Sequence, residues 1–157
     1  MRFLVDRAPQ VYRIIGTLEV VGAGWSVVAL LQAFIRAPGA VLPWGLVFVV
    51  LAAYSVVGLA GLLLLRQKEV GEILSIVAQS MQVLQITAGS IAYRFLAGYQ
   101  ASIYVVGDHL AAYGGLTASV NLWRDSGDPP FALGLNLIPL AVLVLLARLP
   151  GVTPSKR

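Results

Sequence analysis

The stretch Val41 to Leu65, VLPWGLVFVVLAAYSVVGLAGLLLL, carries no charged residue. A helix of this length can cross the apolar core of a bilayer, which is about 30 Å thick and needs roughly 20 residues. A second apolar stretch, Ile14 to Ile35, precedes it and contains one charged residue, Glu19. The segment between them, residues 36–40, is a short turn with Pro and Gly. The sequence therefore predicts two antiparallel membrane-spanning helices at about 12–35 and 41–65.

The composition also indicates a membrane protein. Of 157 residues, 59% are hydrophobic and 11% are charged. A soluble fold would leave much of this apolar surface in water, at a cost of about 25 cal/mol per Å². The chain has no cysteine, which excludes disulfides and thiolate metal sites. We expect one membrane domain over residues 1–157, with its first apolar stretch retained rather than cleaved as a signal peptide.

Two further apolar stretches follow, at about 70–93 and 131–147. The first has no charge between Ile73 and Tyr93 but several polar residues, and the second contains Pro139. Their lengths predict an all-α integral membrane protein, a four-transmembrane-helix bundle. In the alternative interpretation, residues 70–93 lie on the membrane surface as an interfacial helix.

The distribution of Lys and Arg predicts the orientation, because cytoplasmic loops are enriched in both. If all four stretches cross, eight of the eleven Lys and Arg residues lie on the side of the termini and three on the other side. We therefore expect both termini in the cytoplasm and the protein in a bacterial inner membrane. The Lys and Arg residues are explained by membrane topology rather than by nucleic-acid binding. The cytoplasmic cations would be Arg2, Arg7, Arg13, Arg66, Lys68, Arg148, Lys156 and Arg157, and those outside would be Arg36, Arg94 and Arg124.

Residues 94–128 have a different pattern. Apolar and polar residues largely alternate in residues 99–106 and 116–123, which is typical of half-buried strands. The linking residues 107–115 include three glycines and can reverse the chain. We expect an extracytoplasmic β-hairpin between the third and fourth helices, with Tyr99, Tyr104 and Trp123 available for interactions. An amphipathic interfacial helix with an aromatic belt is the competing interpretation.

The third stretch has a polar face. At 100° per residue, Ser75, Gln79, Gln82 and Gln85 lie within one arc of a helix. This face either bonds to neighbouring helices inside one chain or lines a pore formed by several copies.

Glu19 is the single acidic residue deep in a predicted span, where a carboxylate costs about 2.5–3.5 kcal/mol. It therefore needs a partner, and in the four-span arrangement it lies at the depth of Ser75 and Gln79. We predict that these two faces meet, either as a packing contact or as a proton or cation site. Asn136 is expected to bond to the third helix, and Pro139 to kink the fourth.

No nucleotide-binding, metal-binding or nucleophile motif is present, and Asp108-His109 is best explained as a chance adjacency. We therefore expect no catalytic residue, cofactor or metal. The sequence favours a non-enzymatic protein that acts through association, as a homo-oligomer or an accessory subunit of a membrane complex, with membrane lipids and membrane proteins as its partners. A channel lined by the glutamine face is the alternative, and an enzyme acting on a lipid-linked substrate is the third.

Overall fold

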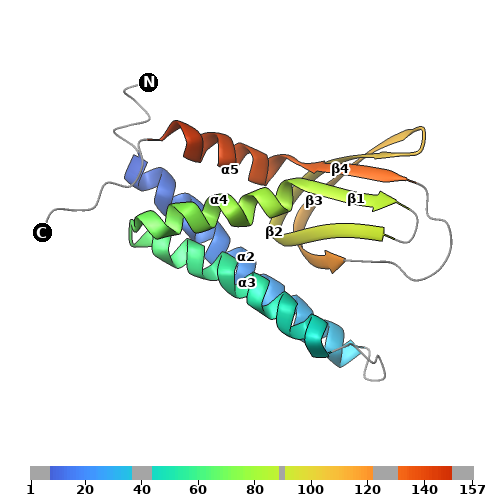
Figure 1. Ribbon diagram of the computed structural model, residues 1–157, viewed down its shortest axis with the longest axis horizontal. Coiled ribbons are helices and arrows are strands. Elements are labelled where there is room, and N and C mark those ends of the chain that lie inside the picture. The colour runs from blue at the N-terminus through green and yellow to red at the C-terminus, as the bar shows by residue number, and fades with distance from the viewer. Residues whose placement is uncertain (1–7, 37–43, 89–90, 122–130, 150–157) are drawn as a thin grey trace, which may run out of the picture.

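The computed structural model describes residues 8–36, 44–88, 91–121 and 131–149 (Figure 1). Two of its helices are long and apolar enough to cross a membrane, over Ala8–Ala33 and Val47–Leu65. They lie side by side and run antiparallel, as the sequence predicted. The helices in the described residues are α2 (Ala8–Arg36), α3 (Trp44–Leu65), α4 (Glu69–Val83) and α5 (Leu137–Arg148).

Glycine allows α2 and α3 to pack closely. A Cβ atom built on Gly16 would lie 2.7 Å from the carbonyl oxygen of Gly61, and one on Gly61 would lie 2.6 Å from the carbonyl oxygen of Gly16. The two backbones are therefore in direct contact at this crossing. One buried apolar cluster joins α2 and α3 to α5. It comprises Ala8, Tyr12, Ile15, Leu64, Val142, Leu146 and Leu149.

The strands form one antiparallel sheet in the order β1-β4-β2-β3, with an additional pairing between β1 and β2. The long strand β2 pairs with β1 near its start, at Ile91–Tyr93, and with β4 near its end, at Ser102–Val106. Because β1 and β4 also pair with each other, each of β1, β2 and β4 pairs with the other two, and the three strands form a closed arrangement. The strands are β1 (Leu84–Ala88), β2 (Ile91–Val106), β3 (His109–Asn121) and β4 (Ala132–Asn136).

The sheet packs against α2 at a second glycine contact. Gly98, in the middle of β2, has φ +101°, and its Cβ position lies 2.7 Å from the Cα atom of Gly22 in α2. Tyr54 of α3 stacks on Phe95 of β2 at 5.9 Å between ring centroids. The sheet is thus held against the two long helices rather than separated from them.

The prediction of an all-α four-transmembrane-helix bundle is wrong. The stretch 70–93 is helical only to Val83, and the stretch 131–147 begins as a strand and becomes helical at Leu137. Only α2 and α3 are candidate spans among the described residues. The residues at 84–88, LQITA, alternate in polarity and include β-branched side chains, so they suit a strand once β4 is available to pair with them.

The region predicted as a hairpin contains β2 and β3, which pair along thirteen residues with a two-residue turn at Gly107 and Asp108. Gly107 has φ +56°, which this type of turn requires. Gly114 and Gly115 lie within β3 and are not part of the turn. The hairpin is not isolated, because β2 also pairs with β1 and β4.

Candidate functional site

Buried polar side chains gather where α2, α4, α5 and the sheet meet. In a protein with so many apolar residues on its surface, this inward placement is the main chemical feature. The group comprises Glu19, Ser26, Ser75, Gln79, Gln82, Gln85, Ser102 and Asn136.

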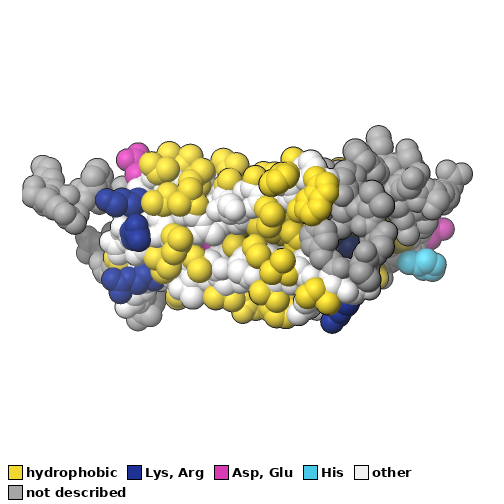
Figure 2. All heavy atoms as spheres, turned by 90° about the horizontal axis from the view of Figure 1, so that it is seen from below, with side chains coloured by type: hydrophobic (Ala, Val, Ile, Leu, Met, Phe, Trp, Pro, Cys, Tyr) yellow, Lys and Arg dark blue, Asp and Glu magenta, His cyan; other side chains and the backbone are white. Residues whose placement is uncertain are grey.

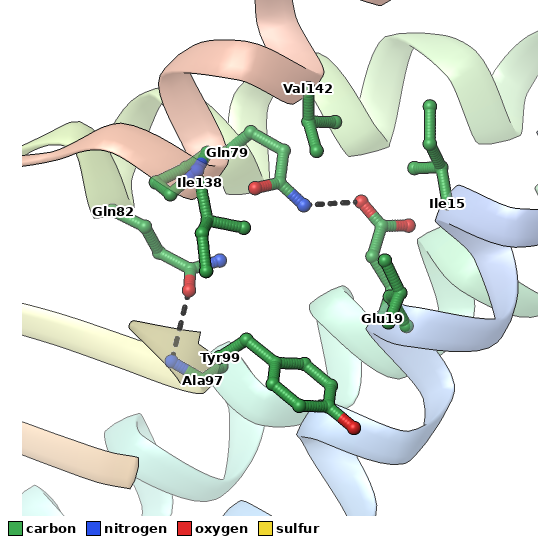
Figure 3. Close-up of a pocket in the computed structure, with 10 residues that line it drawn as sticks. Ile15, Glu19, Gln79, Gln82, Ala97, Tyr99, Ile138 and Val142 are labelled. Carbon is green, nitrogen blue, oxygen red and sulfur yellow. Dashed lines mark hydrogen bonds between the residues drawn. The ribbon is translucent and has the colours of Figure 1, made fainter. Parts of the chain in front are cut away.

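Glu19 of α2 is 3% exposed and contacts the polar face of α4. Its Oε1 atom accepts a hydrogen bond from the Ser75 hydroxyl and another, of 2.8 Å, from Gln79 Nε2. Ser75 and Gln79 are four residues apart, so a helix places both on one face. The contact between α2 and the third stretch that the sequence predicted is thus present, as Figure 3 shows for Glu19 and Gln79.

A cavity of about 30 Å³ adjoins this carboxyl group. Its polar wall includes Glu19, Gln79 and Gln82, and its apolar wall includes Ile15 and Val142 (Figure 3). The second carboxyl oxygen, Glu19 Oε2, has no hydrogen-bond partner among the described residues. A space of this size holds one water molecule, which could satisfy that oxygen.

Gln82 joins α4 to the sheet. Its Nε2 donates to the Ala78 carbonyl at 3.2 Å, and its Oε1 accepts from the backbone N–H of Ala97 at 2.9 Å. A buried backbone N–H needs a partner, and here a side chain supplies it at the contact between β2 and α4. Gln82 thus has both an acceptor and a donor partner inside one chain.

A second polar cluster fills the space enclosed by β1, β2 and β4. Tyr104 donates its hydroxyl hydrogen to Gln85 Oε1, and Gln85 Nε2 donates to Ser102 Oγ at 3.2 Å. Gln100 Nε2 donates to the Tyr104 hydroxyl oxygen at 2.7 Å and to Ser102 Oγ at 2.9 Å. Gln85 and Tyr104 both lie opposite Gly134 in register, which places them on the same face of the sheet. This inner face is polar and hydrogen-bonded.

Arg94 lies beside this cluster. Its guanidinium carbon is 5.4 Å from the centroid of the Tyr104 ring, within the range of a cation–π interaction. Tyr113 meets the same ring edge-on at 5.3 Å. The Tyr104 ring also fills the space above Gly134, since a Cβ atom at Gly134 would overlap it at 2.4 Å. Tyr104 is thus the central packing residue of the enclosed space.

Asn136 does not bond to the third stretch, so that prediction is wrong. Its Oδ1 accepts from the backbone N–H of Ala101 in β2 at 3.2 Å and from Ile138 at 3.4 Å. It is the N-cap of α5, and it is fully buried. Pro139 is the third residue of α5, where an N–H has no intrahelical acceptor, so proline causes no kink there.

The residues predicted for extracytoplasmic interactions have different environments. Tyr99 is partly exposed and also lines the Glu19 cavity, whereas Tyr104 is buried inside the sheet. Trp123 lies outside the described residues. Sequence reasoning missed Gln100, Ser102 and Arg94, although the spacing of two between Gln100, Ser102 and Tyr104 was available as a signal.

Replacing Glu19 tests what the carboxyl group does. Glu19→Leu removes the acceptor for Ser75 and Gln79, so we expect the free energy of unfolding to fall by about 2–4 kcal/mol. Glu19→Gln keeps one carbonyl oxygen for both donors, so its free energy of unfolding should fall by less than about 1 kcal/mol. Unfolding of the detergent-solubilised protein by dodecyl sulfate, followed by circular dichroism, measures both. Equal losses would show that the charge, and not the acceptor, stabilises the contact.

Comparison with protein-family models, with curated proteins and with solved structures finds no match to this chain.

Proposed function

We propose that this chain is a non-enzymatic integral membrane protein that acts through association, with a second copy of itself or as an accessory subunit of a membrane complex. The observation that carries this proposal is the open edge of β3. On one side β3 pairs with β2 from His109 to Asn121, and no described strand pairs with its other side. Such an edge presents unpaired N–H and C=O groups that another strand can bind.

The side chains of β3 support an association surface. Leu110 is 75% exposed and Tyr113 is 60% exposed, and Leu116 is exposed as well. Large apolar and aromatic side chains beside an unpaired strand edge are typical of a surface that another protein covers. The small residues of α2 do not supply such a surface, because Gly16 and Gly22 are already packed against α3 and β2.

The membrane location is supported by α2 and α3 and by the placement of charge. The start of α2, the end of α3, the start of α4 and the end of α5 lie at one end of the molecule (Figure 1). That end carries Arg13, Arg66, Lys68 and Arg148 in the described residues. By the positive-inside rule we assign this end to the cytoplasm of a bacterial cell, with the plasma membrane as its location.

The pore hypothesis has less support. Gln79, Gln82 and Gln85 are all buried, and each has a hydrogen-bond partner within the chain. Turning these amides toward an axis shared by several copies would break those bonds. Each buried group left without a partner costs about 1–3 kcal/mol. Conductance measured across bilayers that contain the purified protein would decide this point, and we expect none.

Photo-crosslinking tests the β3 edge. We would replace Tyr113 by benzoylphenylalanine and irradiate native membranes. The matched control is the same replacement at Phe48, an exposed aromatic residue of α3. We expect a defined adduct from position 113 and none from position 48. An adduct of twice the protomer mass identifies self-association, and one of another mass identifies a second subunit, which mass spectrometry then names. Adducts from position 48 alone, or from neither position, would contradict the proposal.

A further inference from the structure

The sheet has an apolar outer face. In register, Ile86 of β1, Leu133 of β4 and Val105 of β2 form one row of neighbours, and all three side chains are exposed. The next row contains Leu84, Leu135 and Ile103, of which Leu84 and Ile103 are exposed. The opposite, inner face holds the polar cluster around Tyr104. This arrangement is the reverse of a water-soluble sheet, which turns its polar face outward.

The helices that continue these strands have the same inside-out pattern. The buried face of α4 includes Ser75, Gln79 and Gln82, whereas its exposed face carries the large apolar residues Val70, Ile73, Ile76, Val77 and Met81. On this exposed face Ser80 is polar, and its hydroxyl is bonded to the Ile76 carbonyl within the helix. The exposed residues of α5 before Arg148 are Leu137, Ala141, Val144, Leu145 and Ala147.

Helix and strand together have the length of a bilayer core. From Ile73 to Ala88 the chain has no charged residue. Its helical part, up to Val83, rises about 16 Å and β1 about 17 Å, which is about 33 Å in all. From Ala132 to Ala147, β4 and α5 give about the same length, also without a charge. The two segments lie antiparallel, because β1 pairs with β4 and α4 packs on α5.

Hydrogen bonding of the backbone is compatible with lipid around these two strands. A strand can lie in hydrocarbon only where both of its edges are paired. β1 pairs with β4 on one side, and its residues from Ile86 to Ala88 pair with β2 on the other. β4 pairs with both β1 and β2. The closure of the three strands by β2 therefore leaves neither β1 nor β4 at a sheet edge.

Charged side chains lie mainly beyond the two ends of these segments. Arg66 and Lys68 lie between α3 and α4, and Glu69 begins α4. At the far end of the sheet, Asp108 lies in the turn between β2 and β3, and His109 begins β3 (Figure 1). Figure 2 shows one face on which hydrophobic side chains are frequent over the part of the surface next to the end that carries a group of Lys and Arg side chains.

Arg94 is the described cation of the sheet between these ends. It packs over the Tyr104 ring on the inner face, away from the apolar rows. The charge of Arg94 is therefore on the inner face and not on the apolar outer face.

We propose that α4–β1 and β4–α5 are two composite helix–strand segments that lie in the bilayer beside α2 and α3, and that lipid acyl chains cover the outer face of the sheet. This inference rests on the proposed membrane location. β1, β4 and the part of β2 that pairs with them are then part of the membrane domain and not a domain in the aqueous phase. Its polar cluster is enclosed by protein, while its apolar rows contact lipid.

Site-directed spin labelling distinguishes lipid from water and from protein at these rows. The natural chain has no cysteine, so single substitutions can be labelled without other changes. We would label Leu133→Cys and Ile103→Cys in lipid vesicles, with Asp108→Cys as the aqueous reference and Phe48→Cys on α3 as the lipid reference. Collision with oxygen reports lipid, and collision with a nickel chelate reports water.

We expect positions 133 and 103 to resemble position 48, with frequent oxygen collisions and few nickel collisions, and position 108 to show the reverse. Nickel access at 133 and 103 together with lipid contact at 48 would overturn this inference and leave the membrane location intact. Exclusion of both reagents at 133 and 103 would show a protein partner there and would also overturn it. Nickel access at position 48 would overturn the membrane location itself. Two outer-face positions on different strands guard against a label that disturbs one of them.

Discussion

Gly98→Ala is expected to lower the free energy of unfolding by about 2–5 kcal/mol, the sum of backbone strain and overpacking. Gly98 has φ +101°, a region that an alanine enters only with strain. Its new Cβ would also lie 2.7 Å from the Cα atom of Gly22, where no side chain can move aside. The sheet and α2 would have to separate. Dodecyl sulfate titration of the detergent-solubilised protein, followed by circular dichroism, measures the loss.

Three further alanine variants separate the two causes. Gly115→Ala, at φ +145° with open space around it, measures strain alone. Gly22→Ala measures overpacking alone, because its Cβ would lie 2.8 Å from the Ala97 carbonyl oxygen in a regular helix. Gly24→Ala on the same helix meets nothing within 4 Å and should be neutral or slightly stabilising. If Gly22→Ala were as stable as Gly24→Ala, the close contact between α2 and β2 would not exist.

Tyr104→Ala is expected to cost about 3–5 kcal/mol, the usual range for removal of a buried aromatic ring. The ring is 4% exposed and fills the space above Gly134 inside the closed strands. Its removal also takes away the hydrogen-bond donor to Gln85 and the acceptor for Gln100. The same titration measures the loss, and the change in the sheet should be visible in the far-ultraviolet circular dichroism.

Two tyrosine variants control for this result. Tyr104→Phe keeps the ring and removes the hydroxyl, so we expect a smaller loss of about 1–3 kcal/mol. Tyr113→Ala removes an exposed ring that touches Tyr104 at its edge, and its cost should be below about 1.5 kcal/mol. A loss for Tyr104→Ala no greater than that for Tyr113→Ala would mean that the enclosed space is not a packed core.

The contact at Glu19 was predictable from sequence because it depends on local geometry. Helical periodicity places Ser75 and Gln79 on one face, and a buried carboxyl in an apolar helix needs donors. The partner of Asn136 was not predictable in this way. That residue ends a strand and caps α5, and its acceptor oxygen meets Ala101, thirty-five residues earlier in the chain. Such a contact follows from strand register, which the local pattern does not specify.

The enclosed polar cluster was not predictable either, because helical periodicity and strand alternation both explain the position of Gln85. Gln85 was assigned to a helical polar face with Gln79 and Gln82, because the three residues share one arc at 100° per position. The helix ends at Val83, and Gln85 points inward from β1 toward Tyr104. Alternation in a strand and periodicity in a helix place the same residue on a buried face, so burial of Gln85 does not distinguish them.

By itself the sequence determined the two long apolar helices, their antiparallel arrangement and the inward placement of polar residues. The turn predicted between these helices lies mostly outside the described residues. Each of these depends on composition and on periodicity within one segment. Only the tertiary structure decided that residues 84–88 and 132–136 are strands and that β2 closes them into a polar-centred sheet. The physical reason is that a short apolar stretch satisfies its backbone either within a helix or by pairing with a distant strand, and the second choice depends on residues far away in the chain.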